Sequence, residues 1–521
     1  MGTLAEPMAA PQQGPHGSQS GDSRAGARRI IALLAAINVV IFAAYVVASY
    51  GFARHAPFGT PEPLEAAALD RLASSLAFMG PGIGALLGGE SALSDPGTFF
   101  VGYALFLAIP VLVFVFLLGC LARYRLQLEQ VIADALYRWA VVFAVLLAFA
   151  HPVLVQDFWL SAGWGRLVAQ GVNPYYVNLD PGVTAGLPLD YLGLLMTYGP
   201  LWAIVSGIVM KVAGGSAVIA GALFKVVLAL AWIGSLAMVR RLLRTRPAAD
   251  QCVGLAIAGW LPLGVMQIVA EGHNDGGMVF LILLWLVLIE RGRTLAATGA
   301  LAASVLIKYL SAPMFLLDLL HLVRSRGGRL IGYWPHAAVA ASITVAVMAV
   351  FFRSPGFFAS TAHMADWHFF TPRDAVVALG RLAGIEPSLG SLGGVVVVAM
   401  ALTVQGFFLV VLALGLIRYV RHPGVETFRY AALAVTAGML FGVVGHVWPW
   451  FLAWGVLVAA LHPAARLTRW MTGVALAMPF PLLYWVVYPG AEQFTVVTPP
   501  LYLFALAWFV LTPRRWFGAA G

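Results

Sequence analysis

The carboxylate of Asp157 stands directly after an apolar run, residues 139–155. A carboxylate near lipid is costly in its charged form, so such a group usually serves a function. The segment that follows carries Arg166 and is rich in Trp and Tyr, which favour the membrane–water interface. A carboxylate, an arginine and aromatic rings just outside a bilayer suit a reaction on a lipid-linked substrate. The structural alternative for Asp157 is a helix cap in a loop.

A second polar segment, residues 271–277 with the sequence EGHNDGG, joins two apolar runs. The side chains of His273, Asn274 and Asp275 offer directional hydrogen bonds to a sugar or a diphosphate. A plain turn between two spans is the alternative. His273 and Asp275 are too few ligands to indicate a metal ion. We therefore expect no metal ion and no cofactor.

Two lysines lie in apolar surroundings. Lys308 ends an apolar run, where it could snorkel to the interface or bind a lipid phosphate. Lys225 lies inside an apolar run, and intramembrane lysines usually face the bundle interior or a wet cavity. A structural role beside a carboxylate is the alternative for Lys225. Together with Arg166, these lysines are the candidates for binding a carrier phosphate.

Aromatic residues near the expected outer ends of spans are candidate carbohydrate platforms, because sugars stack their C–H faces on aromatic rings. They are Tyr198, Trp367, His446 and Trp448. Tyr198 opens the short apolar segment 198–213, where the following proline suits the first turn of a helix. For any single Trp, a place in the interfacial aromatic belt is the alternative.

The composition indicates what positions these groups. Of 521 residues, 61% are hydrophobic and 10% are charged, whereas about a quarter are charged in a soluble globular protein. The apolar runs do not alternate in polarity, which excludes an outer-membrane barrel and predicts an all-α, polytopic transmembrane bundle. The net charge of +9 comes from short basic clusters between runs, a positive-inside pattern and not a nucleic-acid signal. The cysteines, Cys120 and Cys252, indicate neither a disulfide framework nor a metal cluster.

We predict about 13–15 helices, several of them shorter than the roughly 20 residues that a spanning helix needs. The predicted spans are 30–50, 99–121, 133–155, 216–239, 252–270, 275–290, 294–310, 311–323, 332–352, 393–418, 428–446, 450–462, 470–488 and 499–512.

The basic clusters can all face the cytoplasm only if the segment 198–213 does not cross the membrane. We therefore predict a re-entrant or interfacial helix there, which places Asp157 and the other polar motifs outside. This layout divides the chain into four parts: a disordered cytoplasmic tail at 1–27, two spans with an outer loop at 28–129, a transmembrane core at 130–465 and C-terminal spans at 466–521. In the outer loop, residues 62–88 are expected to be helical.

The order of several short motifs resembles a known family. Gln156-Asp157 followed by residues 162–175, AGWGRLVAQGVNPY, resembles the first extracytoplasmic loop of the GT-C membrane glycosyltransferases. The segments 198–202 (YGPLW) and 272–275 (GHND), and a lysine before an apolar segment with a proline, recur there in the same order. Over about residues 130–460 the chain resembles bacterial polyprenol-phosphate-mannose-dependent α-(1,6)-mannosyltransferases and glycosyltransferase family 87.

The resemblance implies a GT-C fold, in which residues 130–465 form the catalytic core and residues 28–129 are a two-span addition to it. It also implies a hexosyltransferase with an inverting mechanism. The sugar, expected to be mannose, would pass from a polyprenyl-phosphate carrier to a glycan or glycolipid acceptor. The reaction would serve cell-envelope glycan biosynthesis at the outer face of the bacterial cytoplasmic (inner) membrane. The expected partners are thus the lipid-linked donor, the acceptor and membrane lipid, without nucleic acid.

The resemblance also assigns roles to the candidate residues. Asp157 would be the catalytic base. The expected ligands of the donor phosphate are Lys308, Arg166 and Lys225. The expected contacts to sugar or acceptor are Tyr198, His273, Asn274, Asp275, Trp367, His446 and Trp448, and His273 is also a candidate to neutralise the departing phosphate.

Two other classes of function remain. In a transporter or flippase of lipid-linked glycans, Asp157, Lys225 and Lys308 would form a gated polar path. Such transporters often contain sequence repeats, and the sequence shows no convincing one. The chain could also be a non-catalytic member of a polysaccharide assembly complex.

Overall fold

The computed structural model describes residues 16–55, 96–125, 128–154, 156–187, 189, 193–325, 329–365, 367–487 and 491–517. These residues form helices and connecting loops without a β-strand, apart from one isolated bridge between Phe369 and His446. The predicted all-α membrane protein is therefore confirmed. The expected helix at 62–88 lies outside the described residues.

Within the described part, seven helices are long and apolar enough to cross a membrane. They lie in α1 (His16–His55), α4 (Pro96–Arg123), α5 (Gln130–Leu147), α9 (Ala217–Leu243), α15 (Trp334–Phe351, extended by η5, Leu330–Tyr333), α18 (Leu392–Arg421) and α23 (Ala491–Leu511). A further candidate combines α10 (Ala248–Trp260) with α11 (Pro262–Val265) and the π-helical turn η3 (Met266–Ala270). This pair is bent by 41° at Pro262, because proline lacks the N–H that would continue the helix.

Other predicted spans are shorter helices. They are α12 (Asp275–Glu290), α13 (Thr294–Ile307), α14 (Met314–Ser325), α19 (Val425–Gly438) with η7 (Met439–Val443), α20 (Pro449–Ala459), α21 (Arg466–Ala477) and α22 (Pro479–Val487). The predicted pair 294–310 and 311–323 is broken at Lys308, whose backbone is extended (φ −153°, ψ 125°). Every residue of α20 is buried, so this helix fills the bundle interior and does not face lipid.

The helix α1 begins at His16, inside the segment predicted to be a disordered tail at 1–27. Alanines and arginines at 24–29 are good helix formers, so the apolar span continues toward its N-terminal side. Residues 1–15 of the predicted tail lie outside the described residues.

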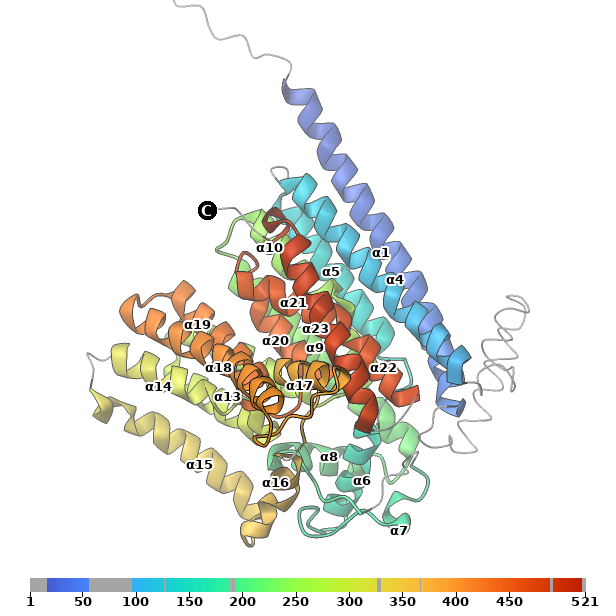
Figure 1. Cartoon of the computed structure of the whole chain (residues 1–521), viewed down its shortest axis with the longest axis vertical. Coiled ribbons are helices and arrows are strands. Elements are labelled where there is room, and N and C mark those ends of the chain that lie inside the picture. Colours follow the sequence, from blue (N-terminus) through green and yellow to red (C-terminus); the bar gives the residue numbers. More distant parts are fainter. Residues whose placement is uncertain are drawn as a thin grey trace, which may run out of the picture.

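Short helices gather at one end of the bundle (Figure 1). They are α6 (Asp157–Ala169), α7 (Pro181–Thr184), α8 (Pro200–Val212) and α16 (Ala359–Ala365), preceded by η6 (Pro355–Phe358). The helix α17 (Pro372–Leu382) lies across the bundle just above them. Together, these short elements form the end of the molecule that carries Asp157.

The helix α8 covers the segment 198–213 that was predicted not to cross. Its 13 residues span about 20 Å, less than the roughly 30 Å of a bilayer core. It packs on α6 at close range, because a Cβ at Gly165 would overlap the backbone of Ser206 and one at Gly207 would overlap Val168. Its length and packing fit an interfacial or re-entrant helix.

Four arginines of the basic clusters form ion pairs at the opposite end of the bundle, where α1 begins and α23 ends (Figure 1). The pairs are Arg28–Glu129 (3.6 Å), Arg125–Asp250 (3.1 Å), Arg240–Asp134 (2.7 Å) and Arg246–Glu426. This shared end agrees with the single cytoplasmic side that the sequence predicts.

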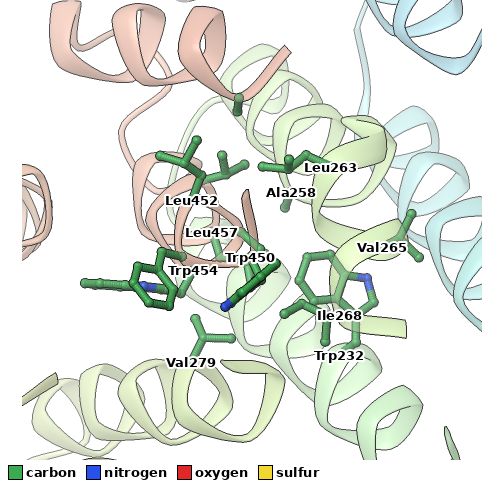
Figure 2. Close-up of a cluster of buried hydrophobic side chains, with 14 of the residues drawn as sticks. Trp232, Ala258, Leu263, Val265, Ile268, Val279, Trp450, Leu452, Trp454 and Leu457 are labelled. Carbon is green, nitrogen blue, oxygen red and sulfur yellow. The ribbon is translucent and has the colours of Figure 1, made fainter. Parts of the chain in front are cut away.

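A cluster of large apolar side chains lies between α9, α12 and α20 (Figure 2). Trp232, Val279, Trp450 and Trp454 are each at most 3% exposed. In a bilayer, such a cluster is stabilised by close packing more than by exclusion of water. Because Trp450 begins α20, the cluster also fixes a ring beside the candidate site.

The carboxylate of Glu271, fully buried directly after η3, accepts four hydrogen bonds. Tyr45 and Tyr103 donate their hydroxyls to Oε1 at 3.0 and 2.9 Å, and the N–H groups of Val153 and Leu154 donate to Oε2 at 2.9 and 2.8 Å. Four donors match the acceptor capacity of a carboxylate. The two N-terminal spans, predicted to be an addition, are thus hydrogen-bonded to the core through α1 and α4.

We predict that a cysteine in the loop after α9 is protected from an impermeant thiol reagent applied outside the cell. In a background with Cys120 and Cys252 replaced by Ala, Thr245→Cys should stay unlabelled, because the basic clusters hold this end in the cytoplasm. Gln170→Cys, which is exposed beside α6, should be labelled. Labelling of the cysteine at 245 and not of the one at 170 would show that the topology is the inverse of the predicted one.

We further predict that Glu271→Gln destabilises the protein, because an amide offers one acceptor oxygen where the carboxylate offers two. Losing a hydrogen bond to a charged group typically costs about 1.5–3 kcal/mol. The thermal midpoint of the purified protein in detergent should fall. Glu129→Gln is the control, since that side chain is 39% exposed. Equal midpoints for the two variants would show that the four hydrogen bonds carry no stability.

Candidate active site

A cavity of about 780 Å³ lies between α6, α17, α23 and the loop before α8. This volume falls in the range of small-molecule sites, about 300–1,000 Å³. Charged and polar residues on its walls include Asp157, Tyr198, Lys308, Arg373, Asp374 and Arg381. Aromatic residues on its walls include Trp164, Trp367, Trp448 and Trp450.

Asp157 is the first residue of α6, where the helix dipole favours a negative charge. Its side chain is 26% exposed and lines the cavity. Burial raises the pKa of Asp157, while the charge of Lys308 and a hydrogen bond from Tyr198 partly oppose this shift. Trp202 donates its indole N–H to Ser161 Oγ at 3.0 Å, which joins α6 to α8. The carboxylate is therefore held in place and reachable from the cavity.

His273 lies behind Asp157. Its Nδ1 is 2.7 Å from the carbonyl oxygen of Gln267 and must donate to it, so the lone pair of the neutral ring is on Nε2. This Nε2 is 3.8 Å from Asp157 Oδ2, longer than a hydrogen bond. The ring stacks on Trp450 with centroids 3.9 Å apart. Burial lowers the pKa of His273 to about 3, so the ring is neutral and lacks the charge expected to neutralise a phosphate.

Lys308 points into the protein and does not snorkel away from it. Its Nζ lies 2.7 Å from Asp275 Oδ2 and 4.3 Å from the ring centre of Phe451. Lys308 lines the cavity although only 8% of its surface is exposed. Asp275 is fully buried at the start of α12, and the ion pair compensates its charge.

Buried polar atoms near this ion pair lack protein partners. Within the described part, Asp275 Oδ1, Asn274 Nδ2 and His273 Nε2 are buried and make no hydrogen bond. Buried polar groups are normally paired, so these atoms suit a ligand or ordered water. Sequence reasoning placed these residues at the site, and the structure brings them beside Asp157 and Lys308.

Two expected phosphate ligands lie elsewhere. Arg166 donates to the carbonyl oxygens of Val183 and Ala185, both at 2.7 Å, and so holds the loop around α7. Lys225 donates to the carbonyl oxygens of Val269, at 2.8 Å, and Ala270. Neither Arg166 nor Lys225 lines the cavity. Both cations stabilise backbone segments by donating hydrogen bonds to their carbonyl groups, because unpaired carbonyl groups in an apolar interior are costly.

The expected aromatic platform is partly assembled. Trp367 and Trp448 line the cavity, and Trp448 stacks on Trp450 with centroids 4.8 Å apart. His446 is 8% exposed and packs against Trp367 and Phe369, at ring distances of 5.9 and 5.2 Å. Burial lowers the pKa of His446 to about 4. His446 therefore supports the aromatic wall from behind.

Two π-helical turns lead into the site. η3 ends immediately before Glu271 and the loop with His273, and η7 ends immediately before the loop with His446. Such turns are rare and occur frequently at functional sites, because they re-aim the residues that follow.

Sequence reasoning missed α17, which supplies Arg373, Asp374 and Arg381 to the cavity. A signal was available, because Thr371, Pro372 and Asp374 form the N-terminal signature of a capped helix. The long apolar runs on either side hid this short amphipathic segment. The neighbouring Asp366 lies outside the described residues.

The family comparison covers much of this site. The model of a family described as alpha-(1->6)-mannopyranosyltransferase, N-terminal domain (MptA_B family), matches residues 73–324. The matched range contains Asp157, His273, Asp275 and Lys308, whereas α17 and Trp448 follow it. The comparison with curated proteins finds no match. Residues 73–324 therefore match the model of an alpha-(1->6)-mannopyranosyltransferase family, which the sequence motifs resemble, in a chain whose apolar helices are those of a multi-pass membrane protein.

Proposed function

We propose that the protein transfers mannose from a polyprenyl-phosphate carrier to a glycan or glycolipid acceptor. The reaction would take place at the outer face of the bacterial cytoplasmic membrane, with inversion at the anomeric carbon. The observation that carries the proposal is the cavity at one end of an apolar bundle, which exposes Asp157 and Lys308 together. A lipid-linked donor can reach such a cavity from the bilayer, and the sugar arrives already activated.

In the proposed reaction, Asp157 accepts the proton of an acceptor hydroxyl. The hydroxyl oxygen then attacks C1 of mannose, and the bond between C1 and the phosphate oxygen breaks. Polyprenyl phosphate leaves with the electron pair. A base in this position typically contributes about 10²–10⁴-fold to the rate.

The surroundings of Asp157 suit a base that must hold a proton after the transfer. Burial disfavours the charged carboxylate and therefore strengthens its affinity for the proton. The lone pair on His273 Nε2, 3.8 Å away, could accept a hydrogen bond from the protonated carboxyl group after a small movement. His273 is thus proposed to position Asp157.

The remaining residues complete a subsite for the donor sugar. The charge of Lys308, oriented by Asp275, would favour the negative charge that develops on the departing phosphate. Trp367 and Trp448 line the cavity and offer ring faces to a sugar, and the buried amide of Asn274 has a donor without a protein partner. The family match favours this enzyme over a flippase or a non-catalytic subunit.

We predict that Asp157→Asn keeps the fold and donor binding and lowers turnover by about two to four orders of magnitude. The assay follows both glycan product and released polyprenyl phosphate from purified protein and synthetic polyprenyl-phosphate mannose. Asp180→Asn is the matched control, since Asp180 only caps the short helix α7. Wild-type protein that moves the donor across vesicles without releasing lipid phosphate would favour the flippase. Near-wild-type transfer by Asp157→Asn would show that Asp157 is not the catalytic base.

The raised pKa of Asp157 also predicts the acid side of the pH profile. The base works only when deprotonated, so kcat/KM should fall as the pH drops through a value above the ordinary aspartate pKa of about 3.9. His273, with a pKa of about 3, stays neutral over this range. The residual activity of Asp157→Asn should lack this acid limb. An acid limb at or below the ordinary aspartate value would contradict the assignment.

A further inference from the structure

The helix α17 presents one continuous face to the cavity. Arg373, Asp374, Val377, Ala378 and Arg381 all line it, and their spacing places them along one side of a helix. On other sides, Leu379 and Leu382 are 47% and 61% exposed. In membrane proteins, amphipathic helices of this kind typically lie at the interface with the lipid head groups. Figure 1 shows α17 crossing the bundle between the long helices and the end with α6.

The start of α17 is firmly held. Thr371 and Asp374 form a reciprocal capping box, with Thr371 Oγ1 donating to Asp374 Oδ2 at 2.6 Å. Phe370, just before it, has φ 57°, a left-handed conformation that bulky residues rarely adopt. Tyr502 from α23 donates its hydroxyl to the Phe370 carbonyl oxygen at 2.7 Å. Strained residues that the surroundings hold in place often lie at ligand sites.

The cations on the cavity wall differ in what they bind. Lys308 is paired with Asp275, and Arg381 donates to Glu386 at 3.2 and 3.3 Å. In the part of the chain that the structure describes, Arg373 has neither a hydrogen-bond nor an ion-pair partner. The neighbouring carboxylate of Asp374 is already engaged by Thr371. Arg373 therefore keeps its planar set of donors open to the cavity.

The geometry of an inverting displacement separates the base from the leaving group. The incoming oxygen and the departing oxygen lie on opposite sides of C1, so a second cation can contact the phosphate directly while the charge of Lys308 acts on it from the side of the base. Lys308 is close enough to Asp157 to oppose the rise of its pKa. Arg373 reaches the same cavity from a different element, the helix α17.

We propose that Arg373 binds the phosphate of the polyprenyl carrier directly, with the charge of Lys308 acting on the reacting centre from the side of Asp157. This assignment rests on the proposed function. A guanidinium can bind two phosphate oxygens at once, which orients the carrier as well as attracting it. The exposed leucines of α17 then face the lipid into which the polyprenyl chain runs.

The test compares Arg373→Gln with Arg381→Gln, which removes a paired arginine from the same face of α17. Arg353→Gln, an exposed arginine that donates to backbone carbonyls near its own helix end, is the outside control. For Arg373→Gln, KM for polyprenyl-phosphate mannose should rise about tenfold, the effect of one lost charge-assisted contact. The value of kcat should change far less, and Arg373→Lys should restore part of the affinity. Thermal midpoints check that each variant is folded.

A direct binding measurement tests the role of Arg373 independently of whether the protein transfers mannose. Polyprenyl phosphate without sugar is titrated into full-length protein in phosphatidylcholine nanodiscs, with intrinsic tryptophan fluorescence as the readout. Weaker binding by Arg373→Gln and not by Arg353→Gln supports the assignment, even if the wild type were to fail to transfer mannose. Unchanged binding and KM would overturn it while leaving the proposed function intact.

Two other outcomes would also overturn the assignment. Equal weakening by Arg373→Gln and Arg381→Gln would show that the overall charge of the cavity matters and that a specific contact does not. If phosphatidylglycerol nanodiscs show a response that depends on Arg373, and polyprenyl phosphate shows none, then Arg373 contacts phospholipid head groups.

Discussion

The buried carboxylate of Glu271 is the constraint on which the site depends. It accepts hydrogen bonds from Tyr45 and Tyr103 on one side and from the backbone of residues 153–154 on the other. Asp157 follows that backbone segment within three residues, and His273 follows Glu271 within two. One carboxylate thus sets the distance between the proposed base and its neighbour. In an apolar interior, a carboxylate that loses one of its hydrogen-bond donors is costly, so the four donors resist displacement.

Most charged groups near the site belong to such fixed arrangements. Lys225 and Arg166 hold backbone carbonyl groups, and Asp275 holds Lys308. Each is satisfied within the protein because the bilayer offers no alternative partner. Asp157 and Arg373 line the cavity from two separate elements, and among the described residues Arg373 has no hydrogen-bond or ion-pair partner. A site that binds a charged lipid needs this division between groups that build the wall and groups left for the substrate.

The proposed reaction requires a membrane-bound donor and a glycan or glycolipid acceptor to meet at one site. The cavity lies at one end of the bundle, where α6, α8 and α17 replace long spanning helices. The helix α17 exposes its leucines and turns its charged residues to the cavity, which is the pattern of an amphipathic helix at a membrane interface. The sugar would then sit among Trp367, Trp448 and Trp450, while the carrier chain stays in lipid. The match to a mannosyltransferase family agrees with a cavity that binds a sugar.

The sequence by itself determined the helical membrane class and most helix positions, and it predicted the family resemblance and the role of Asp157, because apolar runs and local motifs are encoded in short stretches. It also placed His273, Asp275 and Lys308 near the site. Only the tertiary structure decided that Arg166 and Lys225 bind backbone carbonyls, because a lone cation in a sequence does not reveal which polar group it faces. It likewise decided that α17 lines the cavity, since contacts between residues some 200 positions apart depend on how the helices pack.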